Sequence, residues 1–311
     1  MFGFEQTSKP SLSIVIRSYT QTDELVMLLE CLGKQSTLAD ELVIIDSGSA
    51  NWVVQKVRLL CKDGLNGHQG DNIPVKLLEI DKGDYQSARA LNQAIAHTRC
   101  DLVAIISQDA LPVDNDYLKY LVEAMEDDTI AGAYGRQKSY KDKDNLLWEK
   151  DLHLTYPAES RTQYAPDCWF VNTCSIIRRK LWEEHPFDEH ANISEDHEWA
   201  KWAQAQGYAI RYEARAVVYH FHHFPGMRNL WNRFYEEGKG LAYIHQVRVD
   251  LPRSVFRYLR EIASDGVWLT RKGRPWRFPA SVYRRAIKHA ALYNGYRDGL
   301  SKTESEDAPK S

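Results

Sequence analysis

Two groups of carboxylates are placed where they could do chemistry. Asp109 follows the apolar stretch 101–106 and precedes Pro112, and Glu195 and Asp196 are adjacent at the start of a predicted helix. A divalent cation that bridges two phosphates needs only one or two protein carboxylates, because phosphate oxygens and water fill its other sites. A separate carboxylate can remove a proton from a hydroxyl. The two groups therefore predict an enzyme that transfers a group from a metal-bound phosphate ester.

Only one of the two adjacent carboxylates can be the base, because neighbouring residues on a helix point in different directions. Acidic residues also favour the first turn of any helix, where they interact with the positive end of the helix dipole. A structural role for Glu195 and Asp196 therefore stays open. Trp199 and Trp202 follow on the same helix and could line a sugar site or pack in the core.

Two histidines could complete the metal site. In Tyr219-His220-Phe221-His222, alternate residues of a strand share one face, so His220 and His222 would point the same way. An imidazole ligand would suit Mn²⁺ better than Mg²⁺. Each could instead be an ordinary core or surface histidine. A zinc hydrolase is disfavoured, because the sequence has no clear motif with a third ligand.

The elements that must position these residues alternate between strands and helices. Short apolar, β-branched runs predict strands, and capping residues followed by apolar positions at helical spacing predict helices. This order predicts an α/β fold with a mostly parallel sheet covered on both faces. The predicted strands are Leu12–Ile16, Leu42–Ile45, Val75–Ile80 and Leu102–Ile106, and the predicted helices run from Thr22 or Asp23 to Gly33, from Trp52 to Cys61 and from Tyr85 to His97.

A polar cluster follows each of the four predicted strands. The clusters are Arg17-Ser18-Tyr19, Asp46-Ser47-Gly48-Ser49, Asp81-Lys82-Gly83 and Gln108-Asp109. Parallel sheets bind ligands outside the carboxyl ends of their strands, so we expect one ligand site at this edge. The chain has neither a Gly-x-Gly-x-x-Gly motif nor a P-loop motif. Side chains rather than a glycine-rich loop would therefore hold a nucleotide.

The length and composition fit one large domain, or one domain with an appendage. The 311 residues are 43% hydrophobic and include nine Trp, which is enough for a substantial core. The sequence contains no apolar run of about 18 residues, so we expect no transmembrane helix. The first ten residues lack a basic region followed by an apolar one, and the five cysteines show no CxxC spacing. We therefore expect a cytoplasmic protein with reduced thiols.

The net charge of −3 hides an asymmetry along the chain. Residues 1–225 contain 23 Lys or Arg and 34 Asp or Glu, whereas residues 226–300 contain 15 and 6. We expect a first domain at 1–225, a helical, basic and aromatic region at 226–300, and a disordered polar tail at 301–311. The basic region would suit peripheral contact with the inner face of the cell membrane. A homodimer interface is the alternative, and nucleic acid is not expected as a partner.

Taken in this order, the motifs resemble the inverting family 2 glycosyltransferases, which have the GT-A fold. The resemblance covers about residues 11 to 240. It rests on the segments 13–19, 41–49 and 83–92, and on 107–109 in the place of the family's Asp-x-Asp motif. Within the family, the segments 107–112, 133–137, 172–178, 194–196 and 218–222 resemble the bacterial rhamnosyltransferase branch.

The resemblance implies a role for each residue of the expected site. Asp196 would be the base that deprotonates the acceptor hydroxyl, with Glu195 binding acceptor hydroxyls or capping the helix. Asp109 would be the main metal ligand, because Ser107 stands where the motif has its first acid. The donor-binding residues would be Arg17, Tyr19, Asp46, Ser49, Arg89 and Gln108.

Several of these donor-binding residues have structural alternatives. Asp46 could accept the imide N–H of uracil or thymine, or it could stabilise a turn. Arg17, which stands where the family more often has proline, could meet a phosphate or base or form a surface ion pair. Arg89 could grip the diphosphate or be a solvated helix charge. Gln108 could contact the ribose or the diphosphate.

The activity that the resemblance implies is transfer of a sugar with inversion. The donor would be a dTDP- or UDP-sugar, with L-rhamnose suggested by the rhamnosyltransferase branch, and the cofactor Mg²⁺ or Mn²⁺. The acceptor would be a hydroxyl of a glycan or lipid-linked glycan. A nucleotidyltransferase usually has a Gly-rich N-terminal loop, which Arg17-Ser18-Tyr19 does not match. A non-catalytic scaffold of the same fold is the other alternative, favoured by Ser107.

Overall fold

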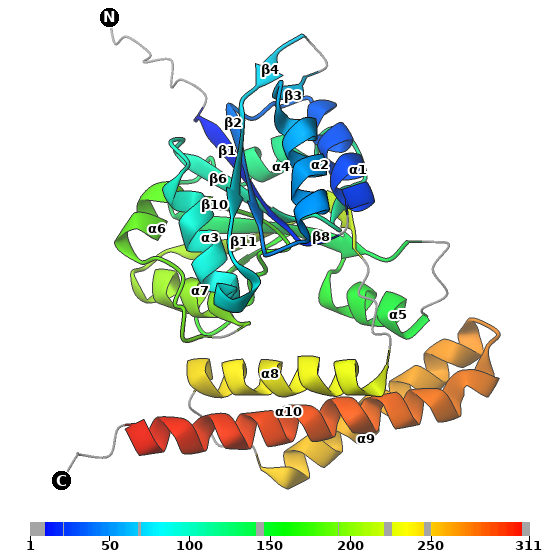
Figure 1. Cartoon of the computed structure of the whole chain (residues 1–311). Helices are drawn as coiled ribbons and strands as arrows, with labels where there is room; N and C mark the ends of the chain where they lie inside the picture. The colour runs from blue at the N-terminus through cyan, green and yellow to red at the C-terminus, as the bar shows by residue number, and fades with distance from the viewer. Residues whose placement is uncertain are drawn as a thin grey trace, which may run out of the picture.

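A central β-sheet organises the chain (Figure 1). The computed structural model describes residues 10–20, 22–67, 70–140, 146–191, 193–220, 226–245 and 250–306, with side chains as far as 300. The four predicted strands are confirmed to within two residues at their ends, and they run parallel to one another. In order across the sheet they are β5 (Val75–Glu79), β2 (Glu41–Asp46), β1 (Leu12–Ser18) and β6 (Leu102–Ser107).

The other half of the sheet is mixed, which the sequence did not predict. β10 is antiparallel to β6 and β8, and β11 is parallel to β8. Two short strands, β7 and β9, pair antiparallel with β11. The bounds are β7 (Leu111–Pro112), β8 (Ile130–Lys138), β9 (Arg161–Gln163), β10 (Cys174–Arg178) and β11 (Ala209–Tyr219), and a separate pair is formed by β3 (Leu65–Asn66) and β4 (Asn72–Ile73).

Helices cover both faces of the sheet, because its central strands are apolar on both sides. On α1, the predicted apolar positions Leu25, Leu28, Leu29 and Leu32 are all buried. One face carries α1 (Thr22–Gly33), α2 (Asn51–Cys61) and α4 (Tyr117–Glu123), and the other carries α3 (Ser87–Ala96), α6 (Arg179–Glu184), α7 (Glu195–Ala205) and the inner side of α5 (Leu146–Thr155).

The helix predicted from Tyr85 begins two residues later. A short helix η1 (Lys82–Asp84) precedes α3, and the side chain of Gln86 accepts a 2.6 Å hydrogen bond from the backbone N–H of Arg89. This bond caps the first turn, so the helix starts at Ser87.

Three long helices follow the sheet domain, α8 (Met227–His245), α9 (Leu251–Arg271) and α10 (Phe278–Glu306), with a short helix η2 (Pro275–Arg277) before α10. They lie together on one side of the molecule (Figure 1). A Cβ atom on Gly295 would lie 2.0 Å from the carbonyl oxygen of Tyr235, and one on Gly238 would lie 2.4 Å from that of Leu292. Glycine therefore permits the close approach of α8 and α10.

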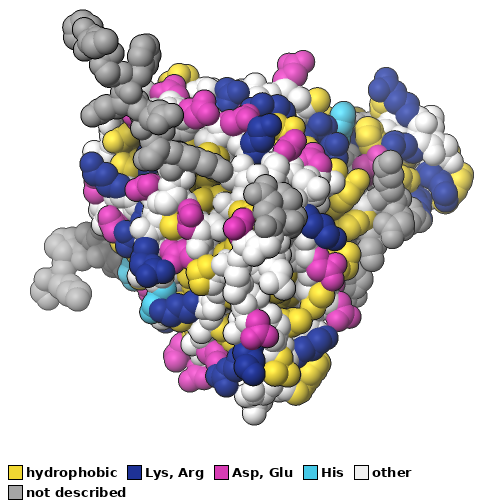
Figure 2. Space-filling view, turned by 90° about the horizontal axis from the view of Figure 1, so that it is seen from above, with side chains coloured by type: hydrophobic (Ala, Val, Ile, Leu, Met, Phe, Trp, Pro, Cys, Tyr) yellow, Lys and Arg dark blue, Asp and Glu magenta, His cyan; other side chains and the backbone are white. Residues whose placement is uncertain are grey.

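A buried acid joins these helices to α5. Asp265 of α9 is fully buried and accepts hydrogen bonds from Lys150 of α5 and from Ser281 and Arg285 of α10. Among the described residues, no helix is long and apolar enough to cross a membrane. Figure 2 views the molecule from the end opposite these helices, and there acidic and basic side chains are interspersed.

Candidate active site

The parallel strands bring the predicted polar clusters to one edge. β1 lies between β2 and β6, with Ser18 beside Asp46 and Arg17 beside Ser107. The cluster Asp81-Lys82-Gly83 also reaches this edge, because a Cβ on Gly48 would lie 2.4 Å from the backbone nitrogen of Lys82. The predicted convergence of these clusters is therefore confirmed.

Asp46 is buried, and its carboxylate stabilises the turn that follows it. Oδ1 accepts hydrogen bonds from the backbone N–H groups of Gly48 and Ser49 at 3.1 and 2.8 Å, and Oδ2 accepts one from the Ser49 hydroxyl at 2.7 Å. The Ser49 hydroxyl in turn accepts a hydrogen bond from the N–H of Thr20 at 2.8 Å. Gly48 has a φ of +81°, which favours glycine. Asp46 and Ser49 thus fix the shape of the expected nucleotide-binding edge.

The side chain of Gln108 holds the loop after β1. Its Oε1 accepts a hydrogen bond from the N–H of Tyr19 at 2.9 Å, and its Nε2 donates one to the carbonyl of Tyr19 at 2.8 Å. Gln108 therefore positions the backbone of Tyr19. The Tyr19 ring is 40% exposed and has the ammonium of Lys82 5.8 Å from its centroid, so it offers an accessible surface beside the edge.

Arg17 does not point freely into the expected donor site. Its guanidinium donates to the hydroxyl of Ser87 and lies 3.9 Å from a carboxylate oxygen of Glu195. Of its two predicted roles, the structure shows an ion pair, but not at the surface as predicted. Its partner is Glu195, which is 3% exposed, so this pair is largely removed from solvent.

Arg89 also has an acidic partner. Its Nε lies 2.9 Å from a carboxylate oxygen of Glu189, and its Nη1 donates to the carbonyl of Asp84 at 3.3 Å. The side chain is 43% exposed, so its charge is partly solvated. To bind a diphosphate, Arg89 would exchange Glu189 for a phosphate oxygen.

Asp109 and His220 face each other at the end of the sheet. The carboxylate of Asp109 lies 3.5 Å from Nε2 of His220, which is almost fully buried just after β11. His222 lies outside the described residues, so its predicted place beside His220 stays a prediction.

The hydrogen bonds of His220 orient its ring toward Asp109. Gln137 of β8 donates from Nε2 to the hydroxyl of Tyr156 at 2.9 Å, which turns its Oε1 toward Nδ1 of His220 at 2.8 Å. An N–H on Nδ1 satisfies that contact, and Nε2 of the neutral ring then presents a lone pair toward the carboxylate. A carboxylate oxygen and an imidazole nitrogen are both ligand types that a divalent cation such as Mn²⁺ accepts. This donor set fits a divalent cation.

Glu195 and Asp196 begin α7 and point to different surroundings. Oε1 of Glu195 accepts a 2.5 Å hydrogen bond from Ser87, and its Oε2 is buried without a partner among the described residues. The carboxylate of Asp196 accepts hydrogen bonds from the N–H groups of Asn172 and His197 at 3.2 and 2.9 Å. Burial raises the pKa of Asp196 to about 6, and it raises the pKa of Glu195 as well. A carboxyl with such a pKa is a suitable general base near neutral pH.

Asp196 lines a cavity of about 570 Å³ between the sheet domain and the C-terminal helices. α7 contributes Asp196 and His197, α8 contributes Arg233 and Glu237, and Trp169 closes another side. The Trp169 ring lies 4.8 Å from that of His197, centroid to centroid. Aromatic and charged groups around a carboxylate are suited to binding sugar hydroxyls. Glu195 is not among the lining residues, which favours Asp196 as the group that meets an acceptor.

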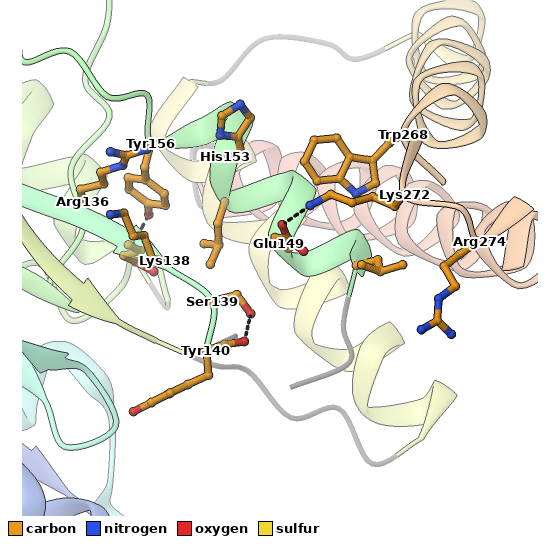
Figure 3. A pocket seen from close by; sticks show the side chains of 13 residues that line it. Arg136, Lys138, Ser139, Tyr140, Glu149, His153, Tyr156, Trp268, Lys272 and Arg274 are labelled. Carbon is orange, nitrogen blue, oxygen red and sulfur yellow. Dashed lines mark hydrogen bonds and ion pairs between the residues drawn. The ribbon is translucent and has the colours of Figure 1, made fainter. Parts of the chain in front are cut away.

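A second cavity, of about 610 Å³, lies beyond Tyr156 (Figure 3). Tyr156, Leu152 and Gln137 line both cavities. The second cavity is basic and aromatic, with contributions from Arg136, Lys138, Tyr140, His153, Trp268, Lys272 and Arg274.

Trp199 and Trp202 have structural roles. Trp199 is fully buried, and Trp202 stacks on His185 at 4.6 Å between ring centroids. The core alternative is therefore correct for Trp199. Two site residues were not predicted as such, Ser87 and Gln137. The signal for Gln137 was an amide near the end of the mostly apolar run 130–137, and the structure shows that this amide is buried.

Comparison with known proteins agrees with this geometry. A model of the family described as glycosyl transferase family 2 matches residues 13–185. The chain is 26% identical over 298 residues to the O-antigen chain rhamnosyltransferase RfbN of Salmonella typhimurium, which covers 93% of this chain and 89% of that protein. It is 23% identical over 301 residues, with the same coverage, to the O-antigen chain rhamnosyltransferase WbaN of Salmonella anatum.

Among solved structures, the mannosyltransferase PcManGT from Pyrobaculum calidifontis, in complex with GDP-Man and Mn²⁺, is similar at a TM-score of 0.65. It is 17% identical and the match covers 95% of this chain and 88% of that chain. This similarity confirms the predicted fold class, an α/β GT-A fold with helices appended at its C-terminal end. Because the family model spans more than half of the sequence, the chain belongs to glycosyl transferase family 2.

Proposed function

We propose that the protein moves a sugar from a nucleotide diphosphate donor to a hydroxyl of a glycan or lipid-linked glycan, with inversion. The observation that carries the proposal is the placement of Asp196. Its carboxylate lines the cavity between the domain and the helices, whereas adjacent Glu195 turns to Ser87 and Arg17. This difference favours Asp196 over Glu195 as the carboxylate that meets an acceptor.

In the proposed reaction, Asp196 takes the proton of the acceptor hydroxyl as that oxygen attacks the anomeric carbon. The new bond joins the acceptor oxygen to the anomeric carbon, and the bond from that carbon to the donor phosphate breaks. The leaving nucleoside diphosphate keeps the electron pair. Attack opposite to the leaving group inverts the anomeric centre. A pKa of about 6 leaves Asp196 mostly ionised at pH 7 and still basic enough to accept the proton.

The donor nucleotide would bind at the edge formed by the loops after β1 and β2. Asp46 and Ser49 fix one side of this edge, and Gln108 holds the backbone of Tyr19 on the other. Arg17 and Arg89 would have to leave their present carboxylate partners, Glu195 and Glu189, in order to bind the diphosphate. The base would be uracil or thymine, recognised at its imide N–H.

Asp109 and His220 would hold the divalent cation, Mg²⁺ or Mn²⁺. When bound, the cation stabilises the charge that develops on the leaving diphosphate. Gln137 fixes the ring of His220 for this purpose.

The donor that we propose is dTDP-L-rhamnose, and the sugar transferred would be L-rhamnose. Support comes from RfbN and WbaN, both described as O-antigen chain rhamnosyltransferases and both similar along most of this chain. The acceptor would then be a growing O-antigen glycan.

Thermal melting with a panel of nucleotide sugars, with Mn²⁺, Mg²⁺ or chelator, tests donor and metal together. A ligand that binds only the folded state raises the melting temperature by mass action. We expect a metal-dependent rise with dTDP-L-rhamnose that is absent in Asp109→Ala. Product analysis with an added glycan acceptor then tests transfer. Donor binding without any product would favour a scaffold. Release of pyrophosphate in a separate assay that supplies a nucleoside triphosphate and a sugar 1-phosphate would favour a nucleotidyltransferase.

A further inference from the structure

An apolar stripe on α9 is exposed to solvent. Val255, Phe256, Leu259 and Val267 are 46%, 64%, 52% and 54% exposed, and Leu251 at the start of the helix is 55% exposed. The helical positions of these residues fall on one side of α9. Large apolar side chains that are aligned and exposed usually mark an interaction surface.

The stripe continues past the end of α9. Trp276 of η2 is 66% exposed and Phe278 is 37% exposed. The Phe278 ring lies against Gly266 of α9, since a Cβ added to Gly266 would be 3.2 Å from the ring. The apolar surface therefore spans α9, η2 and the start of α10.

Basic residues flank the apolar stripe, and the acids of α9 turn inward. Arg253, Arg257, Arg260 and Arg271 are exposed, and their positions on the helix fall together beside the stripe. Asp265 is buried, and Glu261 is paired with Lys288 and Arg285 of α10. The exposed side of α9 is therefore apolar and cationic, apart from Asp250 before its first residue, which lies 3.4 Å from Arg253. Figure 2 shows the opposite end of the molecule, where both signs of charge are interspersed.

We propose that α9 and η2 form a membrane-docking surface that lies in the headgroup region of an anionic bilayer. An amphipathic helix with aromatic and aliphatic residues on one face and arginines beside them binds such a surface through both. A second copy of the chain fits less well, because a two-fold pairing of this patch would bring arginine rows of like charge together.

The placement of the cavities agrees with this surface. Arg260 and Ser264 of α9 line the cavity that contains Asp196, and Trp268 and Lys272 line the second cavity. A bilayer under α9 would bring a membrane-anchored molecule to the openings of both. The inference goes beyond the proposed function, because docking needs neither donor nor transfer.

The test is co-sedimentation of the full chain with vesicles, without substrates. We expect binding to vesicles of phosphatidylcholine with phosphatidylglycerol, weak binding to phosphatidylcholine alone, and loss with added salt. Arg257→Gln with Arg271→Gln should weaken partitioning about 25-fold, or about fivefold for each arginine. Phe256→Glu with Leu259→Glu should weaken it at least tenfold.

The matched control is Trp52→Glu with Leu59→Glu on α2, where two apolar side chains are 69% and 73% exposed. This control should bind vesicles like the unmodified protein. The proposal is overturned if the unmodified protein binds neither vesicle, or if the control loses as much binding. It is also overturned if light scattering shows a dimer that Phe256→Glu with Leu259→Glu dissociates while vesicle binding is absent. The arginine variants keep the test valid if the glutamate variants fold poorly.

Discussion

The hydroxyl of Ser87 donates a 2.5 Å hydrogen bond to the carboxylate of Glu195, 108 residues further along the chain. Arg17 donates to the same hydroxyl and lies 3.9 Å from that carboxylate. The three side chains connect β1 to the first turns of α3 and α7. Asp196, the next residue of α7, therefore depends on this contact for its position.

Removing Arg17 should destabilise the protein through Glu195. In Arg17→Ala, the buried carboxylate loses its cation and keeps only the Ser87 hydroxyl. We expect the free energy of unfolding to fall by about 2 kcal/mol, as for other charged hydrogen bonds. Adding Glu195→Gln removes the unpaired charge, so the double variant should cost less than the sum of the single ones. Urea denaturation of the four proteins at pH 7 measures this, and additive costs would contradict the pairing.

Replacing the proposed base should separate transfer from binding. We expect Asp196→Asn to lower kcat by about 10²- to 10⁴-fold while the affinity for the donor stays nearly unchanged. Glu237→Gln is the matched control, because Glu237 is another carboxyl on the same cavity. Its kcat should stay within about threefold of the unmodified protein. Donor affinity from melting shifts and kcat from product formation provide both numbers. Equal losses of donor affinity and kcat in Asp196→Asn would argue against the base assignment.

The raised pKa of Asp196 predicts the acidic limb of the pH profile. The base must be ionised, so kcat/KM should rise about tenfold per pH unit below pH 6 and level off above it. The same shift has an opposite effect on stability. A carboxyl whose pKa is raised on folding stabilises the folded state below its ordinary pKa, and this contribution is lost as pH rises through about 6. A flat kcat/KM between pH 4.5 and 7.5 would mean that another group is the base.

Local patterns in the sequence were enough to predict the parallel half of the sheet. The apolar runs that became β1, β2, β5 and β6 are short, β-branched and each followed by a polar cluster. Parallel pairing then places all four clusters at one edge. The antiparallel β10, inserted between β6 and β8, has no local signature, because its pairing depends on residues far along the chain.

The partners of the predicted site residues were harder to predict. Arg17 was expected to meet a donor or form a surface pair, and its actual partner, Glu195, comes from a distant helix. Gln108 was expected to contact a ligand, and its amide instead matches both backbone groups of Tyr19. The pattern of strands and polar clusters along the sequence predicts which side chains reach an edge of the sheet. The three-dimensional path of the loops decides what those side chains contact there.

Gln137 should control metal affinity without touching the metal. In Gln137→Leu, the ring of His220 loses the contact at Nδ1 that orients it toward Asp109. We expect the Mn²⁺ concentration for half-maximal donor-dependent stabilisation to rise about 10- to 100-fold. Gln163→Leu is the control, because it removes a buried amide that bonds to Tyr134 instead. If both variants weaken metal dependence equally, the effect comes from lost packing.

Asp265 should be essential for attaching the C-terminal helices to α5. Burial alone would raise the pKa of this carboxyl, but hydrogen bonds from Arg285, Lys150 and Ser281 together lower it below its usual value. The stabilisation is therefore present above the ordinary pKa of an aspartate and is lost as pH falls through the lowered pKa. We expect Asp265→Ala to lower the free energy of unfolding by about 3 to 5 kcal/mol at pH 7, because buried Lys150 loses its carboxylate partner and buried Arg285 loses one of its three.

Asp298→Ala is the comparison for this variant. Asp298 of α10 accepts a hydrogen bond from Tyr235 at 2.9 Å at a partly exposed site, so its loss should cost about 1 kcal/mol. Urea denaturation at pH 7 and pH 3 measures both proteins against the unmodified one. The difference between Asp265→Ala and the unmodified protein should shrink at pH 3, below the ordinary pKa of an aspartate, if the ionised carboxylate is the stabilising group. Because α5 forms a wall of both cavities, Asp265→Ala should also raise the KM for the acceptor while leaving donor-induced stabilisation intact.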